Sequence, residues 1–235
     1  MSNQSDKQLQ PRRRTIRSFV RRTGRMTAGQ ERALNELWPR FGLEYTPLPI
    51  DMPELFGRDA PLVLEIGFGN GESLVQLAAD APQFDFIGIE VHRPGAGHCM
   101  LHAETAELQN LRLVCHDALD VLRHQIARDS LARINLYFPD PWPKARHHKR
   151  RILQHSFLEL AASRLTVDGC LHIATDWANY AEHIDELLAG QSWFRVLERR
   201  EHAGNCALER PSTKFEKRGL GKGHQIYDWK LQRLS

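Results

Sequence analysis

The residues best suited to chemistry stand at the end of a short apolar run. Residues 62–66 read Leu-Val-Leu-Glu-Ile, which is typical of a strand buried on both faces, and Glu65 is the one charged side chain in it. Glycines follow at spacing two: Gly67, Gly69 and Gly71. Apolar side chains then recur at helical spacing through residues 72–80. Because glycine turns tightly and lets a ligand approach the main chain, this strand, turn and helix predict a binding site.

The glycine spacing indicates which kind of ligand the turn accepts. A dinucleotide-binding turn reads G-x-G-x-x-G, whereas here the third glycine falls one place early and Glu72 stands where that pattern has glycine. Glu65 would also bring a negative charge close to phosphates. The turn therefore favours a ligand with a cationic or neutral body and no phosphates. A strand-to-helix turn that binds nothing stays the alternative at this point.

Two further acids follow the next two predicted strands. Residues 84–90 predict a buried strand that ends at Glu90, 19 positions past Gly71, where nucleotide-binding α/β folds hold ribose hydroxyls with a carboxylate. Residues 111–115 predict a third strand, followed by Asp117, which could accept a hydrogen bond from an adenine amino group. These positions suit a nucleoside.

A proline-rich loop follows the fourth predicted strand, residues 133–138. Three prolines, at 139, 141 and 143, enclose Asp140 and hold the backbone stiff. Open α/β sheets place their sites in such loops, at the carboxyl ends of strands. The densely basic residues 144–151 come next.

Length and composition set the class of protein. The 235 residues are 41% hydrophobic, enough to bury a real core, and no apolar run reaches the length of a membrane span. The N-terminus lacks an apolar signal-peptide core. Four scattered cysteines without a C-x-x-C pair indicate reduced thiols in a cytoplasmic protein and make a zinc site improbable. We therefore expect no membrane and no metal.

Charge is unevenly distributed along the chain. Residues 1–30 carry seven arginines and one lysine against one aspartate, a net charge of +7, so the remainder sums to −4 within the overall +3. We expect residues 1–25 to be a basic arm that is disordered until it binds, and residues 26–235 to be a single domain. Such an arm suggests a polyanionic partner, a nucleic acid, with a solubility tail as the alternative.

The remaining pattern predicts the fold. Strands and helices alternate through five strands, the fifth at 170–174, which indicates a parallel sheet with helices on both faces. Two closing strands, 193–197 and 225–231, have a long loop between them and suggest an antiparallel hairpin. Helices are expected at 27–41, 92–108, 118–126, 152–165 and 179–188, and an irregular connector at 42–60. The fold class is therefore α/β, a doubly wound and mostly parallel sheet of seven strands.

These motifs resemble a known family. The glycine turn is similar to that of the class I S-adenosylmethionine-dependent methyltransferases, which share the seven-stranded arrangement. The run Phe-Pro-Asp-Pro-Trp-Pro-Lys at 138–144, the basic stretch behind it, and Arg-Pro-Ser-Thr-Lys-Phe-Glu-Lys-Arg-Gly at 210–219 closely resemble the bacterial tRNA (guanine-N7)-methyltransferases. The resemblance covers roughly residues 35–232. It implies S-adenosylmethionine as methyl donor and tRNA as partner, with a guanine of the variable loop as the target.

The resemblance also implies roles for individual residues. Those expected to line the S-adenosylmethionine site are Glu65, Glu90, Asp117 and Asp140, together with Gly67, Gly69 and Gly71. Those expected to bind the substrate are Lys144, Asp176, Thr213, Lys214, Phe215 and Glu216. Those expected to contact RNA are Arg146, His147, His148, Lys149, Arg150 and Arg151. Asp140 is the candidate catalytic residue.

The chemistry of guanine N7 limits what the acid at 140 has to do. N7 presents a lone pair and carries no hydrogen, so the attacking atom needs no base, and placement and electrostatics remain the tasks of the protein. We interpret Asp140 as an orienter that holds N1–H and the exocyclic amine of guanine. The alternative is that it only caps its own proline turn.

Other side chains keep two interpretations each. Lys144 and Lys214 suit phosphates beside the target nucleotide. Phe215 stacks on a base or anchors its loop. Glu216 and Asp176 accept hydrogen bonds from the guanine edge or fix nearby cations. The histidines at 147 and 148 suit a solvated basic face better than catalysis, and Trp142 is expected to pack within its loop.

Three other functions compete with this interpretation. A methyltransferase acting on an exocyclic amine would carry Asn or Asp-Pro-Pro-aromatic after the fourth strand, where Trp142 occupies the place of the second proline. A nicotinamide-dependent oxidoreductase is disfavoured by Glu65 and Glu72. A non-catalytic tRNA-binding protein would not need all four acids. The sequence leaves open which tRNAs are chosen and whether the protein is a monomer or a homodimer.

Overall fold

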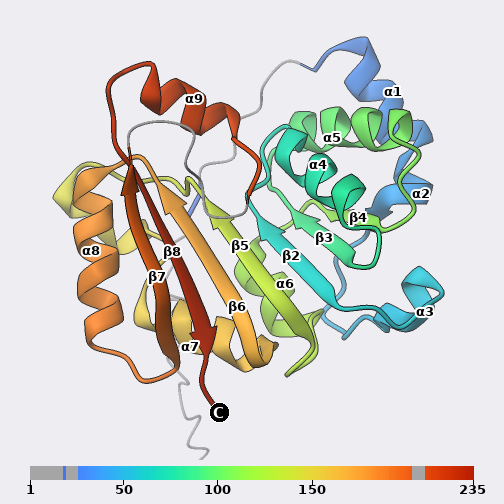
Figure 1. Cartoon of the computed structure of the whole chain (residues 1–235). Helices are drawn as coiled ribbons and strands as arrows, with labels where there is room; N and C mark the ends of the chain where they lie inside the picture. The colour runs from blue at the N-terminus through green and yellow to red at the C-terminus, as the bar shows by residue number, and fades with distance from the viewer. Residues whose placement is uncertain (1–17, 20–25, 203–209) are drawn as a thin grey trace, which may run out of the picture.

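The computed structural model describes residues 18–19, 26–202 and 210–235. The expected disordered arm therefore lies, apart from two residues, outside the described part. Within the described residues eight strands form one sheet, in the order β1-β4-β3-β2-β5-β6-β8-β7 (Figure 1). The strands are β1 Gly42–Leu43, β2 Leu62–Ile66, β3 Asp85–Ile89, β4 Leu111–Val114, β5 Leu131–Tyr137, β6 Leu165–Thr175, β7 Phe194–His202 and β8 Ile226–Arg233.

The pairing confirms the predicted class of sheet. Strands β1 to β6 pair in parallel, and β8 runs antiparallel to both β6 and β7. The eighth strand is β1, which lies in the segment expected to be an irregular connector and pairs Gly42 with Leu113 at the edge of the sheet. A strand of two residues is too short to give a recognisable sequence pattern. The strand β1 is identified only by its pairing with the neighbouring β4.

Helices separate the strands, mostly where the sequence places them. They are α1 Ala28–Glu36, α2 Trp38–Phe41, α3 Met52–Phe56, α4 Glu72–Asp80, α5 Arg93–Thr105, α6 Ala118–His124, α7 His155–Arg164, α8 Ala178–Ala189 and α9 Lys214–Leu220, with a 3₁₀ helix at Ala145–Arg150. The helix expected at 27–41 is split at Leu37, just before the Trp38-Pro39 pair that opens α2. None of the described helices is long and apolar enough to cross a bilayer.

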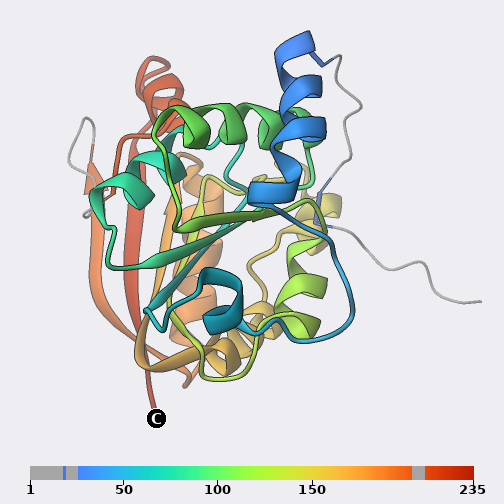
Figure 2. The same cartoon turned by 90° about the vertical axis from the view of Figure 1, so that its right-hand side faces the viewer.

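Side chains alternate between two cores, one on each face of the sheet. Leu64 of β2 faces α6, α7 and α8, whereas its neighbour Val63 faces α1, α4 and α5. Figures 1 and 2 show these helices on opposite sides of the sheet. This alternation is what a strand buried on both faces requires, and it explains why β2 and β3 are entirely buried.

The core that contains Val63 and residues of α1, α4 and α5 does not extend across the whole sheet. It contains no buried residue from β5, β6 or β8. On these strands the corresponding face carries buried polar side chains instead, including Asn135, His172 and Asp228. In Figure 1 this is the face turned toward the viewer, where no described helix lies over β5, β6 and β8. A polar layer therefore takes the place of a helix there.

The helix α9 was not expected. The stretch between the last two strands was predicted to be a loop, but β7 extends to His202 and α9 occupies Lys214–Leu220, above the end of the sheet (Figure 1). Thr213 accepts a hydrogen bond from the Glu216 amide, and Glu216 accepts one from the Thr213 amide, which forms a capping box. The T-x-x-E signal for this start is present in the sequence.

The turn between β2 and α4 allows α5 to approach closely. Gly71 caps α4 with a φ of +80°, a left-handed conformation that favours glycine. A Cβ atom at this position would lie 2.3 Å from the Cys99 sulfur of α5. The absence of a side chain at Gly71 is therefore required by both backbone and packing.

This double requirement is testable with two alanine variants. Gly57 also has a left-handed φ, +69°, but a Cβ there would meet nothing within 4 Å. We expect Gly57→Ala to lower the free energy of unfolding by about 1 kcal/mol through backbone strain alone. Gly71→Ala should lose about 3 kcal/mol, because overpacking against Cys99 adds to the strain. Urea unfolding of both variants measures the difference, and equal losses would show that Cys99 moves aside without cost.

Candidate donor and substrate site

Four acids lie at the carboxyl ends of four neighbouring strands, at one edge of the sheet. Glu65 is the last residue but one of β2, Glu90 lies directly after β3, Asp117 after β4 and Asp140 after β5. Because these strands are adjacent and parallel in the order β4-β3-β2-β5, their carboxyl ends meet at the same edge. The topology therefore brings together the acids that the sequence assigned to one site.

Glu90 holds the glycine turn in place. One of its carboxylate oxygens accepts a hydrogen bond from the Gly69 amide at 2.9 Å. The other accepts from the amides of Val91 at 2.7 Å and His92 at 3.0 Å. Gly67 also donates its amide to the Ile89 carbonyl at 2.8 Å. The end of β3 is thereby tied to the turn, and the half-buried carboxylate stands at its rim.

Glu65 is buried beneath the turn. Its side chain is 3% exposed, and its Oε2 atom has no hydrogen-bond partner. Burial raises the pKa of Glu65 to about 7, although the nearby Arg133 and Asn135 act to lower it. A buried carboxyl group whose pKa is raised toward neutrality and whose Oε2 atom lacks a partner suits a cationic group of a ligand.

Asp117 caps the helix that follows β4. Its side chain accepts a hydrogen bond from the Leu119 amide at 3.0 Å and so opens α6. The residue is half-buried at the edge where β3 and β4 end. This position is compatible with the nucleoside contact that the sequence suggested.

The proline loop that carries Asp140 is strained. Phe138 and Trp142 have φ values of +51° and +45°, in a region that residues other than glycine rarely occupy. Such conformations persist only where the surrounding structure imposes them, and they concentrate at functional sites. Asp140 lies between them and is exposed to solvent. The loop therefore presents its acid outward on a fixed backbone.

Arg151 is one of the groups that impose this conformation. Its Nε atom donates to the Pro141 carbonyl at 2.9 Å, and its terminal nitrogen donates to Asn179 at 2.7 Å. The guanidinium also lies over the ring of Tyr180, and the residue is only 3% exposed. The sequence grouped Arg151 with the RNA contacts, but the structure places it inside the protein, where it braces the loop.

The other basic residues predicted to contact RNA form the surface beside the loop. Lys144, Arg146 and Lys149 are exposed, whereas Arg150 stacks over the Trp142 ring with its guanidinium carbon 3.9 Å from the ring centre. The two histidines at 147 and 148 are half-buried, and desolvation and the nearby arginines lower the pKa of the first. The basic stretch thus stands next to Asp140.

The N-terminal segment reaches the same loop. Trp142 donates its indole N–H to the Ser18 carbonyl at 3.1 Å. Trp142 therefore contacts the described part of the basic N-terminal region, in addition to Arg150 and His147 of the 3₁₀ helix after its loop.

The helix α9 completes the site from the other side. A Cβ atom placed on Gly69 would lie 3.7 Å from the ring of Phe215, so this ring, which is 52% exposed, lies beside the glycine turn. Asp176, after β6, lies against α9: a Cβ on Gly219 would meet its carboxylate at 2.9 Å, and His224 contacts it at 3.3 Å. The structure therefore brings Phe215, a predicted substrate residue, beside the predicted donor residue Gly69, and it places Asp176 against α9.

Glu216 differs from the other substrate candidates on α9. Lys214 is exposed, whereas Glu216 is fully buried and pairs with Arg210 at 2.7 Å. Its second oxygen, Oε1, is buried without a partner. Of the two interpretations that the sequence left open, the structure places Glu216 as the partner of a cation, which is Arg210.

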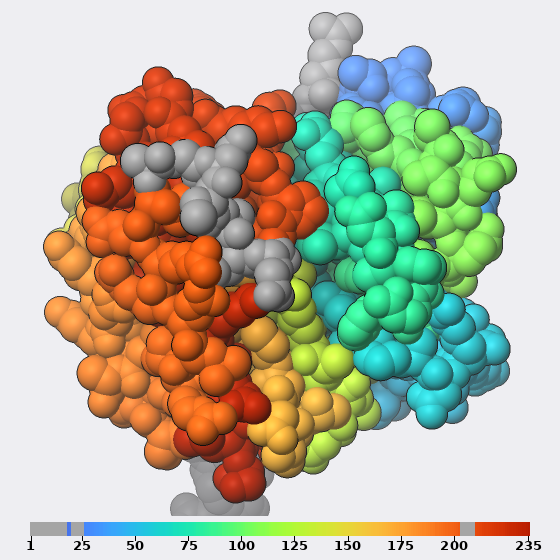
Figure 3. Space-filling view, viewed as in Figure 1, coloured from blue at the N-terminus to red at the C-terminus, as the bar shows by residue number. Residues whose placement is uncertain are grey.

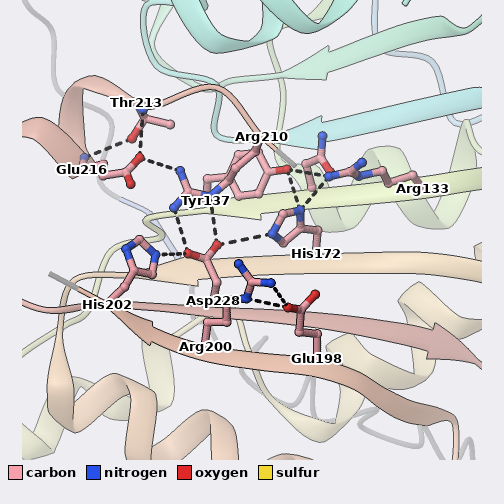
Figure 4. A network of polar contacts seen from close by, with 11 residues as sticks. Arg133, Tyr137, His172, Glu198, Arg200, His202, Arg210, Thr213, Glu216 and Asp228 are labelled. Atoms are coloured by element: carbon pink, nitrogen blue, oxygen red, sulfur yellow. Dashed lines mark hydrogen bonds and ion pairs between the residues drawn. The ribbon is translucent and has the colours of Figure 1, made fainter. Parts of the chain in front are cut away.

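Arg210 belongs to a polar network that the sequence did not suggest (Figure 4). Its guanidinium donates to both oxygens of Asp228, at 2.9 and 3.1 Å. His172 of β6 contacts the same carboxylate through Nε2 at 3.3 Å and receives a hydrogen bond from Arg133 at its Nδ1 atom. Because an arginine can only donate, His172 is the tautomer that carries its hydrogen on Nε2.

Charge within this network is fixed near neutral pH. Burial lowers the pKa of His172 to about 4, so the ring is neutral. Burial alone would raise the pKa of Asp228, but hydrogen bonds from His172 and Arg210 hold it well below the usual range. The only signal for the network in the sequence is the presence of polar residues, such as Asn135 and His172, within predicted buried strands.

Comparison with known proteins agrees with this geometry. Residues 59–229 match the profile of a family described as "Putative methyltransferase". A tRNA (guanine-N(7)-)-methyltransferase of Yersinia enterocolitica is 53% identical over 220 residues, which are 94% of this chain and 92% of the relative. The chain belongs to this family. The tRNA (guanine-N(7)-)-methyltransferase of Aeromonas hydrophila is 51% identical and covers 94% of both chains.

Solved structures outside the family share the fold. The 16S rRNA methyltransferase KamB superposes with a TM-score of 0.60 at 14% identity, over 79% of this chain and 93% of the other. A 16S rRNA (adenine(1408)-N(1))-methyltransferase from Catenulisporales acidiphilia gives a TM-score of 0.56 at 13% identity, over 82% and 93%. At such low sequence identities these two structures show only that the fold is shared; they say nothing of the activity of this tRNA (guanine-N(7)-)-methyltransferase family.

The buried Glu65 makes stability depend on pH in a defined direction. A carboxyl whose pKa rises on folding, here from 4.5 to about 7, disfavours the folded state increasingly as pH rises through that interval. Glutamine carries no charge. We therefore expect the stability of Glu65→Gln relative to the unmodified chain to increase by about 2–3 kcal/mol between pH 5 and pH 8 without ligand.

Denaturant unfolding at both pH values measures this difference. Glu72→Gln is the matched control, because Glu72 is an exposed acid a few residues away on α4. It should change stability equally at both pH values. A Glu65→Gln difference that does not vary with pH would contradict the burial of a free carboxyl.

Proposed function

We propose that this protein transfers the methyl group of S-adenosylmethionine to N7 of a guanine in tRNA. The observation that carries the proposal is the convergence of four acids and α9 at one sheet edge, in a chain about half identical over nearly its full length to tRNA (guanine-N(7)-)-methyltransferases. The variable loop is the expected location of the guanine, and the cytoplasm the expected compartment.

The donor side of the site fits S-adenosylmethionine. The buried Oε2 atom of Glu65 lacks a partner, and a Cβ placed on Gly67 would meet nothing within 4 Å, so the turn is open to a ligand. Glu65, Glu90 and Asp117 would hold the donor, with Gly67 to Gly71 beneath it. The donor supplies an activated methyl group on a sulfonium. The acidic side chain of Glu65 beneath the turn suits a ligand that carries this positive charge and no phosphates.

The acceptor side requires orientation more than proton transfer. Guanine N7 has a free lone pair, so Asp140 would bind the opposite edge of the base, at N1–H and the exocyclic amine, and offset the positive charge that develops on the purine. Its exposed position on a stiff loop suits this task. Phe215 beside the glycine turn would limit where the base can lie.

The surface beside this loop would position the tRNA. Lys144, Arg146 and Lys149 are exposed next to Asp140, and Lys214 is exposed on α9. Lysine and arginine at such places bind phosphates without reading sequence. The basic arm, which reaches the loop at Ser18, would extend this surface.

A direct assay tests the function. The protein is incubated with S-adenosylmethionine labelled in its methyl group and with bulk tRNA, and the modified nucleoside is located by nuclease digestion and mass spectrometry. We expect label in 7-methylguanosine. Label in another nucleoside would replace the proposed activity by another RNA methylation, and donor binding without transfer would favour a non-catalytic tRNA-binding protein.

The role of Asp140 is tested by one isosteric change. Asp140→Asn keeps the size of the side chain but loses the charge and one of the acceptors for guanine. We expect a loss of turnover of about a hundredfold or more, with no rise in rate with pH that a titrating base would give. The matched control Asp80→Asn alters an exposed acid on α4 that contacts Gln76. Turnover of Asp140→Asn near that of the control would refute the role.

The contribution of the arm is tested by removing residues 1–17, which carry five positive charges and one negative charge and end before Ser18. We expect weaker tRNA binding, a shallower dependence of affinity on salt, and unchanged donor affinity. A full-length variant with the five cations replaced by glutamine separates charge from length. An unchanged salt slope in both would exclude the arm from the tRNA contact.

A further inference from the structure

We propose that Arg210 is a positioning residue for methyl transfer, which joins α9 and the start of the proline loop into one rigid frame. The proposal rests on the proposed function, since it assigns a role in that reaction. It derives from three buried charged groups that meet on the sheet face lacking a helix, none of which touches the donor site directly in the described contacts (Figure 4).

The guanidinium of Arg210 is completely enclosed and uses its donors on two acids. Its side chain is 0% exposed, like those of Asp228 and Glu216. It donates twice to Asp228 of β8 and once, at 2.7 Å, to Glu216 of α9. The geometry with Asp228 is the planar, two-point arrangement that arginine forms and lysine cannot. Arg210 is thereby anchored to the sheet and holds the helix.

The same guanidinium contacts the start of the proline loop. It lies 5.4 Å from the ring centre of Tyr137, the last residue of β5, and 5.3 Å from that of Phe138. Phe138 has one of the strained backbone conformations and stands two residues before Asp140. One cation therefore touches both the element that carries Phe215 and the element that carries the candidate catalytic acid.

The capping box transmits this contact to the helix. The Glu216 oxygen that pairs with Arg210 also accepts a hydrogen bond from the Thr213 amide at 3.3 Å. Loss of the guanidinium would leave Glu216 and Asp228 as buried acids without their cation, which is strongly unfavourable. The helix α9 is short and packs on the sheet edge. We therefore expect the start of α9 to move toward solvent, which would hydrate the Glu216 carboxylate and reduce the cost of burying it unpaired.

The space-filling view shows where the C-terminal part of the chain meets the region of α4. The C-terminal part of the chain, in orange and red, and the region of α4, in cyan and green, meet near the middle of this face (Figure 3). Phe215 of α9 lies at this boundary, because a Cβ atom placed on Gly69 would be 3.7 Å from its ring. Arg210 fixes the helix from which that ring projects.

The experiment compares Arg210→Met, Arg210→Lys and the control Arg195→Met in the full-length protein. Arg195 is exposed on β7, where it donates to Gln232 and touches neither site. Turnover and KM for tRNA are measured with labelled donor, donor affinity by calorimetry, and local opening by hydrogen exchange read by mass spectrometry.

We expect a split between turnover and donor binding. Arg210→Met should lose about a hundredfold in kcat, the cost of a displacement near 1 Å at a reacting pair, while donor affinity changes less than about threefold. Arg210→Lys keeps the charge but not the two-point fork, so its kcat should lie between those of Arg210→Met and the unmodified chain. Exchange should accelerate in residues 213–221 and stay unchanged in β2 and α4.

Other results would overturn the proposal. A kcat of Arg210→Met equal to that of the control excludes a positioning role, and so does unchanged exchange in α9. Faster exchange throughout the protein together with lost donor affinity would indicate a purely structural residue. Should Arg210→Met not fold, Arg210→Lys and Asp228→Asn give the same readouts. The exchange result needs no activity, so failure of the proposed function is distinguishable from failure of this inference.

Discussion

The parallel alignment of four neighbouring strands is the constraint on which the site depends. The strands β4, β3, β2 and β5 all end at the same edge. An acid at or just after the end of each strand therefore lies in a common region, although the four acids are far apart in sequence. Backbone contacts then refine the arrangement, as when Glu90 accepts the Gly69 amide. The fold supplies proximity, and the turns supply orientation.

The strands β5, β6 and β8 are covered differently from β2 and β3. Where β2 and β3 are covered by apolar helices, β5, β6 and β8 carry a layer of hydrogen-bonded polar groups on the same face. Asp228 receives hydrogen bonds from Arg210 and both His172 and His202, and thus serves as the centre of this layer. Hydrogen-bonded polar groups such as those around Asp228 specify one arrangement more narrowly than apolar packing does, although Asn135 Nδ2 and Glu216 Oε1 are buried without a partner. The helix α9 is attached to this polar layer through the pair of Arg210 and Glu216.

The sequence predicted the class of sheet and the edge at which the candidate site residues gather, because glycine spacing, proline spacing and buried-strand composition are local signals. It did not predict that Arg151 would turn inward, since a charge run gives no information about which member meets Pro141 and Asn179. It also missed the partnership of Arg210 with Asp228, because these residues come from different elements and only the folded sheet brings them together. The start of α9, in contrast, could have been predicted, because Thr213 and Glu216 form a capping-box signal in the sequence, but a loop was expected there.

The thiols near the donor site have a chemical consequence for a protein that handles an alkylating agent. Cys99 lies directly against Gly71, and Cys115 precedes the segment that contains Asp117. Burial raises the pKa of Cys99 far above its usual range and that of Cys115 to about 11, so both stay protonated in neutral solution. The thiolate, not the protonated thiol, is the nucleophilic form of cysteine. Burial thus keeps both sulfurs beside the proposed donor site in their weakly nucleophilic, protonated form.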